Sequence, residues 1–141
     1  MDLAWKGARA ACLLIPLALA LAGCSTDPAK GNENAVPADA DFRKEAIALL
    51  KTSLDDPTNI RGAAISQPML RPVEGTSRYV ACIRFNPRNM NRDYAGPTEY
   101  IATFYGGHIN HFLKATPGQC SFAAYQPFPE LEKICEGARC D

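Results

Sequence analysis

The sequence lacks a charge excess of either sign, since 15 lysines and arginines balance 15 aspartates and glutamates in 141 residues. A protein that binds nucleic acid through its phosphates usually has a clear basic excess, so we expect no nucleic-acid partner. The sequence also lacks an apolar run long enough to cross a membrane. Its longest run, residues 10–22, is 13 residues long and includes Pro16. A membrane-spanning helix needs about 20 residues.

Motifs for catalysis and metal binding are missing too. The chain has no C-x₂-C pair, no G-x-S-x-G motif and no glycine-rich phosphate loop. Its two histidines, His108 and His111, are three residues apart on an expected strand. Side chains at that spacing point to opposite faces, so we expect no shared metal ion, and we place His111 opposite Ala102 at the edge of the core. The sequence therefore predicts no catalysis, no metal and no other cofactor.

The first 23 residues have the order of an export signal. Lys6 and Arg9 precede the apolar run 10–22, and the length of that run suits the core of a signal peptide. The run ends in Leu21-Ala22-Gly23-Cys24, which places small residues directly before a cysteine. This ending resembles the lipobox of bacterial lipoproteins.

The resemblance to bacterial lipoproteins implies a lipid anchor. Cys24 would receive a diacylglyceryl thioether, residues 1–23 would be removed, and the new amino group would be acylated by a fatty acid such as palmitate. Two or three acyl chains hold a protein stably on a bilayer, whereas one chain binds only marginally. Ser25 stands where the Gram-negative pattern has Asp for inner-membrane retention. The implied location is therefore the outer membrane of the cell envelope, facing the periplasm.

Residues 24–40 predict the lipid-bearing cysteine followed by a flexible tether. The segment 25–40 contains no aromatic residue and one large aliphatic residue, Val36, and two prolines and a glycine interrupt it. Such a segment buries too little apolar surface to become ordered. Its r.m.s. reach of roughly 20–24 Å keeps the following domain near the bilayer. Residues 41–141 then form one small periplasmic domain.

The pattern of that domain predicts an α+β fold, with one N-terminal helix packed on a mostly antiparallel sheet of about four strands. Apolar residues recur at helical spacing over 40–54, and Asp39 or Asp41 is the expected N-cap. Beyond Pro57 the apolar period changes to two. The expected strands are 60–66, 79–85, 98–105 and 108–113; the expected loops are 67–77 and 86–97; and a short helix is expected over 130–136.

Gly106-Gly107 predicts a two-residue hairpin turn. With that turn, Tyr105 pairs with His108 and the register continues without interruption. The hairpin face expected to pack on the helix then consists of Tyr100, Ala102, Phe104, Ile109, His111 and Leu113.

Six cysteines are present. By the resemblance to lipoproteins, Cys12 would leave with the leader and Cys24 would carry lipid. An exported protein folds in an oxidising compartment, so the other four predict two disulfides among three possible pairings. We favour Cys82–Cys120 and Cys135–Cys140. Free thiols at Cys135 and Cys140 are the next alternative, and a zinc site is less favoured than either.

The loop 86–97 is the strongest candidate for a binding segment. Arginine and tyrosine are enriched at binding hot spots, and asparagine offers adaptable hydrogen bonds. The alternative is a long polar connection between two strands, and we favour it over a binding loop because loop composition alone is weak evidence for binding. The candidate binding residues are Arg88, Asn89, Arg92 and Tyr94.

Four segments together resemble small uncharacterised lipoproteins of alphaproteobacteria. The segments are Tyr79–Asn86, the loop to Gly96, Tyr100–Gly107 and Tyr125–Leu131, and the resemblance covers roughly residues 42–135. It implies no activity and no functional residues. We expect a membrane-anchored binding or accessory module that docks an envelope protein or glycan. A periplasmic inhibitor of a lytic or degradative enzyme is the alternative, followed by an unrecognised envelope hydrolase.

Overall fold

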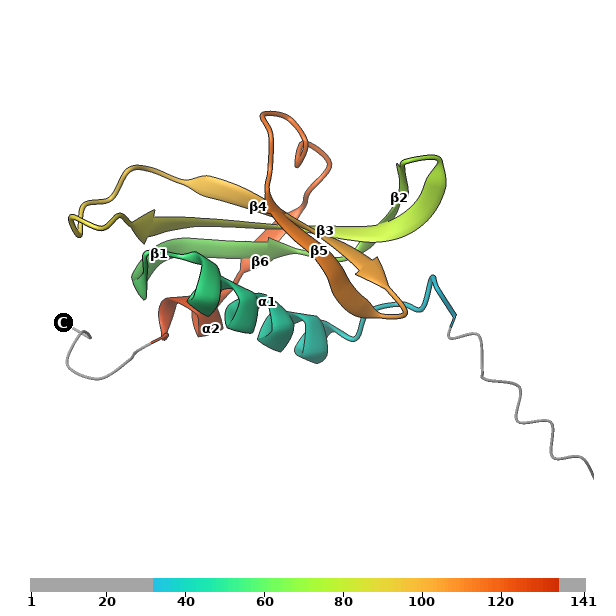
Figure 1. The fold of residues 1–141 in the computed structure, drawn as a ribbon, viewed down its shortest axis with the longest axis horizontal. Coiled ribbons are helices and arrows are strands. Elements are labelled where there is room, and N and C mark those ends of the chain that lie inside the picture. The colour runs from blue at the N-terminus through green and yellow to red at the C-terminus, as the bar shows by residue number, and fades with distance from the viewer. Residues whose placement is uncertain (1–31, 135–141) are drawn as a thin grey trace, which may run out of the picture.

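The computed structural model describes residues 32–134 and shows an α+β domain (Figure 1). The leader, Cys24 and the pair Cys135–Cys140 lie outside the described residues. The elements in chain order are α1 (Asp39–Ser53), β1 (Asp56–Ser66), β2 (Met69–Val73), β3 (Thr76–Arg88), β4 (Thr98–Tyr105), β5 (His108–Lys114), β6 (Tyr125–Pro127) and α2 (Pro129–Glu132).

One antiparallel sheet contains all six strands, in the order β5-β4-β3-β1-β6, with β2 also paired to β3. The long strand β3 pairs first with β2 and then with β1, at Met69↔Val80 and Ile65↔Ile83. The expected loop 67–77 therefore contains a strand, and the expectation of about four strands is too low. Strand β2 has little hydrophobic alternation because every residue from Met69 to Pro72 is exposed.

Helix α1 packs its apolar stripe on the sheet through Phe42, Ala46 and Leu50, which are spaced by one turn and buried. Its N-cap is Ala38, which makes no side-chain capping hydrogen bond. The expectation that Asp39 or Asp41 is the N-cap is therefore wrong. Asp39 and Asp41 lie in the first turn instead, where a carboxylate is stabilised by the positive end of the helix dipole.

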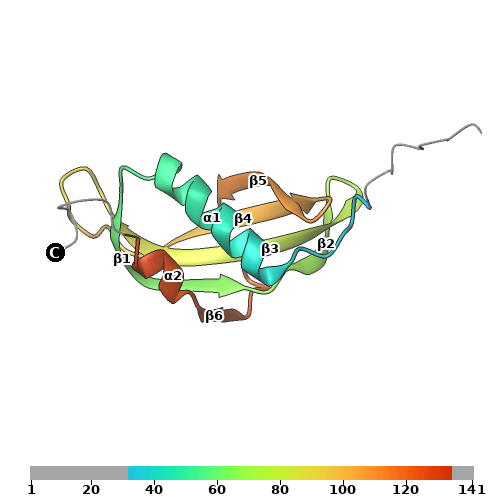
Figure 2. The same cartoon turned by 90° about the horizontal axis from the view of Figure 1, so that it is seen from below.

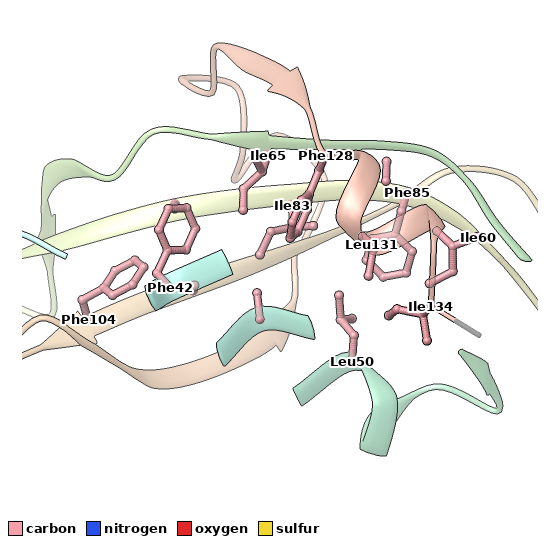
Figure 3. Packing of buried hydrophobic residues seen from close by; sticks show 14 residues of the cluster. Phe42, Leu50, Ile60, Ile65, Ile83, Phe85, Phe104, Phe128, Leu131 and Ile134 are labelled. Carbon is pink, nitrogen blue, oxygen red and sulfur yellow. The ribbon is translucent and has the colours of Figure 1, made fainter. Parts of the chain in front are cut away.

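The core lies between one face of the sheet and the two helices (Figures 2 and 3). Phe42 of α1 meets Phe104 of β4 edge to face, with ring centroids 5.5 Å apart. Phe128 and Leu131 add the C-terminal segment to the same cluster. The short helix expected over 130–136 is α2, which starts at Pro129 and ends at Glu132.

The hairpin β4–β5 departs from the expected register after its first two pairs. Tyr105 pairs with His108 and Phe104 with Ile109, but Thr103 then pairs with His111, which leaves Asn110 as a β-bulge. The extra residue turns Phe112 towards the core, where its ring stacks on Tyr100 at 5.3 Å. The remaining members of the expected core face, His111 and Leu113, are exposed.

Helix α1 fixes the start of β5 beside this bulge. The Glu45 carboxylate accepts a hydrogen bond from the Ile109 amide at 2.8 Å, and its other oxygen lies 2.6 Å from His108 Nδ1. These contacts join residues more than 60 positions apart. No local pattern in the hairpin sequence carries that information, which is why the uninterrupted register was wrong.

The face of the sheet opposite the helices is crossed by the segment that follows β5. The predicted disulfide Cys82–Cys120 is confirmed and joins β3 to this segment across 38 residues. Both cysteines are buried. Next to them, the Ser66 hydroxyl accepts a hydrogen bond from the Cys82 amide at 2.9 Å. This bond satisfies a buried amide at the point where β1 ends.

Candidate binding face

Arg88 of the candidate loop makes an ion pair inside the molecule. Its Nε lies 3.3 Å from Asp56 Oδ2, and only 13% of each side chain is exposed. The other Asp56 oxygen accepts hydrogen bonds from the Thr58 amide and hydroxyl. Burial by itself raises the pKa of Asp56, but the bonds from Thr58 and the charges of Arg88 and Arg92 outweigh it and hold the pKa below its ordinary value.

Asn89 organises the loop itself. Its side-chain oxygen accepts hydrogen bonds from the amides of Asn91 and Asp93, and its backbone amide donates to the Asp93 carbonyl. Arg92 stands in the left-handed backbone region, with φ of 66°, and its amide donates back to Asn89. A short polar side chain that bonds nearby amides is what stabilises such a tight turn.

Tyr94 anchors the returning half of the loop. Its hydroxyl donates to the Asn59 carbonyl at 2.6 Å, and the Arg61 guanidinium lies 4.3 Å from the centre of its ring. Arg88, Asn89 and Tyr94 therefore hold the loop in place by contacts within the domain. Arg92 is exposed, and so is Met90 with 82% of its surface accessible. A binding role for the four loop residues stays a prediction.

A row of four arginines lies on the face opposite the helices, and we call it the arginine face. Each guanidinium stands over an aromatic ring, and such a contact is worth about 0.5–1 kcal/mol at an exposed site. The pairs are Arg61 over Tyr94, Arg84 over Tyr125, Arg71 over Phe122 and Arg78 over Tyr105, at 4.3, 4.6, 4.7 and 4.9 Å.

Strand alternation places these arginines together. Arg84 stands between Ile83 and Phe85, which point into the core, so Arg84 points the other way. Arg61 pairs with Asn86, and Arg71 with Arg78, at matching positions along β3. The sequence shows Arg84 in an alternating strand, but the aromatic partners come from distant segments. The arginine face therefore has no signature in the sequence.

Glu99 is the acidic neighbour of Arg84, opposite it on β4. Its carboxylate accepts a hydrogen bond from the Tyr125 hydroxyl at 2.6 Å. Burial of Tyr125, together with the bond to Glu99 and the charge of that carboxylate, raises the pKa of Tyr125 well above its ordinary value, against the opposing effect of Arg84. Tyr125 therefore stays protonated and connects β6 to β4 across this face.

Two hollows adjoin at Arg84 and Pro97. The larger, of about 580 Å³, is bordered by the segments 95–100 and 114–117 together with Leu54, Arg84 and Pro87. The smaller, of about 280 Å³, is lined by Arg61, Gly62, Arg84, Asn86 and Pro97. Arg61 and Arg84 are both exposed here, so their donors are open to a ligand.

His108 pairs with Glu45, and the hydrogen bond and charge of that carboxylate raise the pKa of the exposed imidazole. Within residues 32–134, no three histidine, cysteine or acidic side chains are grouped as metal ligands. Neither α1 nor α2 in the described part of the chain has the length and apolar character needed to cross a membrane.

Comparisons with protein-family models, with curated proteins and with solved structures find no match for this chain.

Proposed function

We propose that this chain is a cell-envelope lipoprotein whose periplasmic domain is a binding module without catalytic activity. The leader and the Leu21–Cys24 motif support anchoring through acylated Cys24. The disulfide Cys82–Cys120 supports export, since structural disulfides persist in oxidising compartments. Ser25 favours the outer membrane.

The pair of adjoining hollows is the observation that carries the binding function. Their shared border, Arg84, belongs to the central strand β3, which pairs on both edges and is tied down by Cys82–Cys120. A site on a rigid strand loses little conformational freedom when it binds. Lys114 and Thr116 border the larger hollow and supply further hydrogen-bond donors.

The start of the described chain lies at the opposite end of the sheet from the loop 89–97 (Figure 1). The Glu33 carbonyl accepts a hydrogen bond from the Gly106 amide at the β4–β5 turn. The Glu33 carboxylate lies 3.5 Å from the Arg78 guanidinium nitrogen Nη1. A domain tethered from this end presents the loop, and the larger hollow beside it, away from the bilayer.

The anchor is tested by intact-mass measurement of the protein in the membrane fraction. We expect a mature chain that starts at an acylated Cys24, and a Cys24→Ser variant that leaves this fraction. A chain that starts at Met1 without lipid would refute the lipoprotein assignment.

The binding face is tested by site-specific photocrosslinking in the native envelope. A photoreactive residue at Thr116 borders the larger hollow, and one at exposed Ala48 on α1 is the matched control. We expect a discrete adduct from Thr116 and none from Ala48. Equal labelling from both positions would contradict a binding site at the hollows.

The loop 89–97 supports a second candidate function, inhibition of a lytic or degradative enzyme. Asn89 and Tyr94 hold the loop rigidly, and Met90 is 82% exposed. A rigid loop with an exposed apolar residue suits insertion into an enzyme cleft, because it loses little conformational entropy when it binds. Crosslinking from Met90, rather than from Thr116, to an envelope hydrolase would favour this function.

A further inference from the structure

The smaller hollow combines two arginines with no acidic residue in its lining. Its five residues come from β1, β3 and the segment before β4: Arg61, Gly62, Arg84, Asn86 and Pro97. Two other hollows that contain an arginine also contain carboxylates, namely Asp55 and Asp56 beside Arg92, and Asp39 and Glu130 beside Arg43. The hollow at Arg71 has no carboxylate either, but it contains a single arginine.

No carboxylate of residues 32–134 forms an ion pair with either guanidinium in this hollow. Among the described residues, Arg43, Arg78 and Arg88 each have a carboxylate within 4.0 Å, whereas Arg61 and Arg84 have none. The acidic residue opposite Arg84 on the neighbouring strand is Glu99, whose carboxylate accepts a hydrogen bond from Tyr125. Glu99 lines the larger hollow but not the smaller one. Two adjacent unpaired cations repel each other, and a bound anion would relieve that repulsion.

The aromatic contacts leave the hydrogen-bonding edges of both guanidiniums available. The Cζ atoms of Arg61 and Arg84 lie 4.3 and 4.6 Å from the ring centres of Tyr94 and Tyr125. A guanidinium binds anionic oxygens through the N–H groups at its edge, in the plane of the group. The ring contacts therefore hold each arginine in place, and no carboxylate of the described residues forms an ion pair with it.

The remaining lining residues suit an anionic ligand as well. The Asn86 side-chain oxygen accepts the Gly96 amide at 3.2 Å, which leaves the NH₂ group of Asn86 as its free end. Gly62 has φ of 60°, and a Cβ atom there would contact nothing within 4 Å, so the hollow is open above it. The lining thus presents donors from three side chains.

We propose that Arg61, Arg84 and Asn86 bind a phosphate group of the ligand. A phosphate monoester carries about −1.5 to −2 charges at neutral pH and has three terminal oxygens. It therefore matches two guanidiniums and one amide better than a carboxylate, which one arginine can satisfy. This inference rests on the proposed binding function and specifies the chemistry of its ligand.

The test is a titration of the isotope-labelled full chain with inorganic phosphate at fixed ionic strength, followed by NMR. We expect saturable shifts of the Gly62 and Gly96 amides and of the Asn86 side-chain amide. In an Arg61→Gln/Arg84→Gln variant the affinity should fall by about tenfold or more, since hydrogen bonds to charged groups are being lost.

The matched control is Arg71→Gln, which removes an arginine from the same face, over Phe122, outside the hollow. It should leave phosphate affinity unchanged, and the spectra report whether each variant is folded. An equal loss with Arg71→Gln would overturn the site, and so would acetate binding as tightly as phosphate. Shifts without saturation would show nonspecific screening and would also overturn it.

A second arm separates the sources of the phosphate group. Vesicles of phosphatidic acid in phosphatidylcholine present a phosphomonoester headgroup, and pure phosphatidylcholine vesicles are the control. Binding of the Arg71→Gln protein but not of the double variant to phosphatidic acid would assign a lipid source. Binding of inorganic phosphate alone would assign a soluble source. If phosphate fails to bind while Thr116 still crosslinks a partner, the phosphate inference is wrong and the binding function stands.

Discussion

Replacement of Arg88 by alanine separates a structural role of the loop from a binding role. The substitution removes the ion pair to Asp56, whose side chain is 13% exposed, and leaves a nearly buried carboxylate. Breaking a fully buried pair costs about 3–5 kcal/mol. Thr58 still donates two hydrogen bonds to Asp56, and Arg92 still contributes positive charge. We therefore expect a loss of about 2 kcal/mol in the free energy of unfolding.

The assay is urea unfolding of the full chain, with Arg92→Ala as the matched control. Arg92 is exposed, so its replacement should change stability by less than about 0.5 kcal/mol. The effect of Arg88→Ala should also depend on pH. The folded pKa of Asp56 is lowered, so its contribution is present above the unfolded pKa and is lost as the pH falls through the folded pKa.

The difference between wild type and Arg88→Ala should accordingly shrink in acid, because the protonated Asp56 no longer needs a cation. Equal small effects of Arg88→Ala and Arg92→Ala at neutral pH would refute the structural role. A difference that stays constant through the acid range would refute the assignment of the effect to Asp56.

Three further predictions follow from the core, the disulfide and the α1–β5 contact. Phe42→Ala should lower the unfolding free energy by about 3–5 kcal/mol in denaturant titration, because its ring is fully buried; a loss below about 1 kcal/mol would contradict that packing. The double variant Cys82→Ala/Cys120→Ala should lose about 4 kcal/mol by the chain-entropy relation for a 38-residue separation, and unchanged stability would contradict it. Glu45→Gln should lower the pKa of His108 in an NMR titration; an unchanged pKa would exclude the contact. The raised folded pKa means that the His108 contribution is present below its unfolded pKa and is lost as the pH rises through the folded one.

Local patterns predicted the parts of the fold that depend on local chemistry. The helical spacing of Phe42, Ala46 and Leu50 places α1 correctly, and Gly106-Gly107 places the hairpin turn. The pairing Cys82–Cys120 was one of three alternatives that an even count of cysteines left open. Each of these features can be recognised from a few neighbouring residues or from the number of cysteines.

The features that the sequence did not predict depend on distant contacts. Strand β2 is an exposed strand held by backbone bonds to β3, so its side chains show no apolar alternation. The bulge at Asn110 is fixed by Glu45 of α1, far away in the chain. The three-residue strand β6 is too short to give a periodic pattern.

In the candidate site too, the sequence shows the residue types but not the contacts that those residues make. The sequence pattern points to arginine and tyrosine of the loop as candidate binding residues, and in the fold Arg88 and Tyr94 make contacts within the domain. The guanidiniums proposed to bind are those of Arg61 and Arg84, whose aromatic partners lie 33 and 41 residues further along the chain. Only the folded sheet brings these groups to one face.

The most direct test of the proposed function is the yield of the Thr116 crosslink in the native envelope when the hollow loses its arginines. We expect the adduct to disappear in the Arg61→Gln/Arg84→Gln variant and to persist in Arg71→Gln, with Cys24 acylated in both. An adduct of unchanged yield in the double variant would contradict a binding site centred on Arg61 and Arg84.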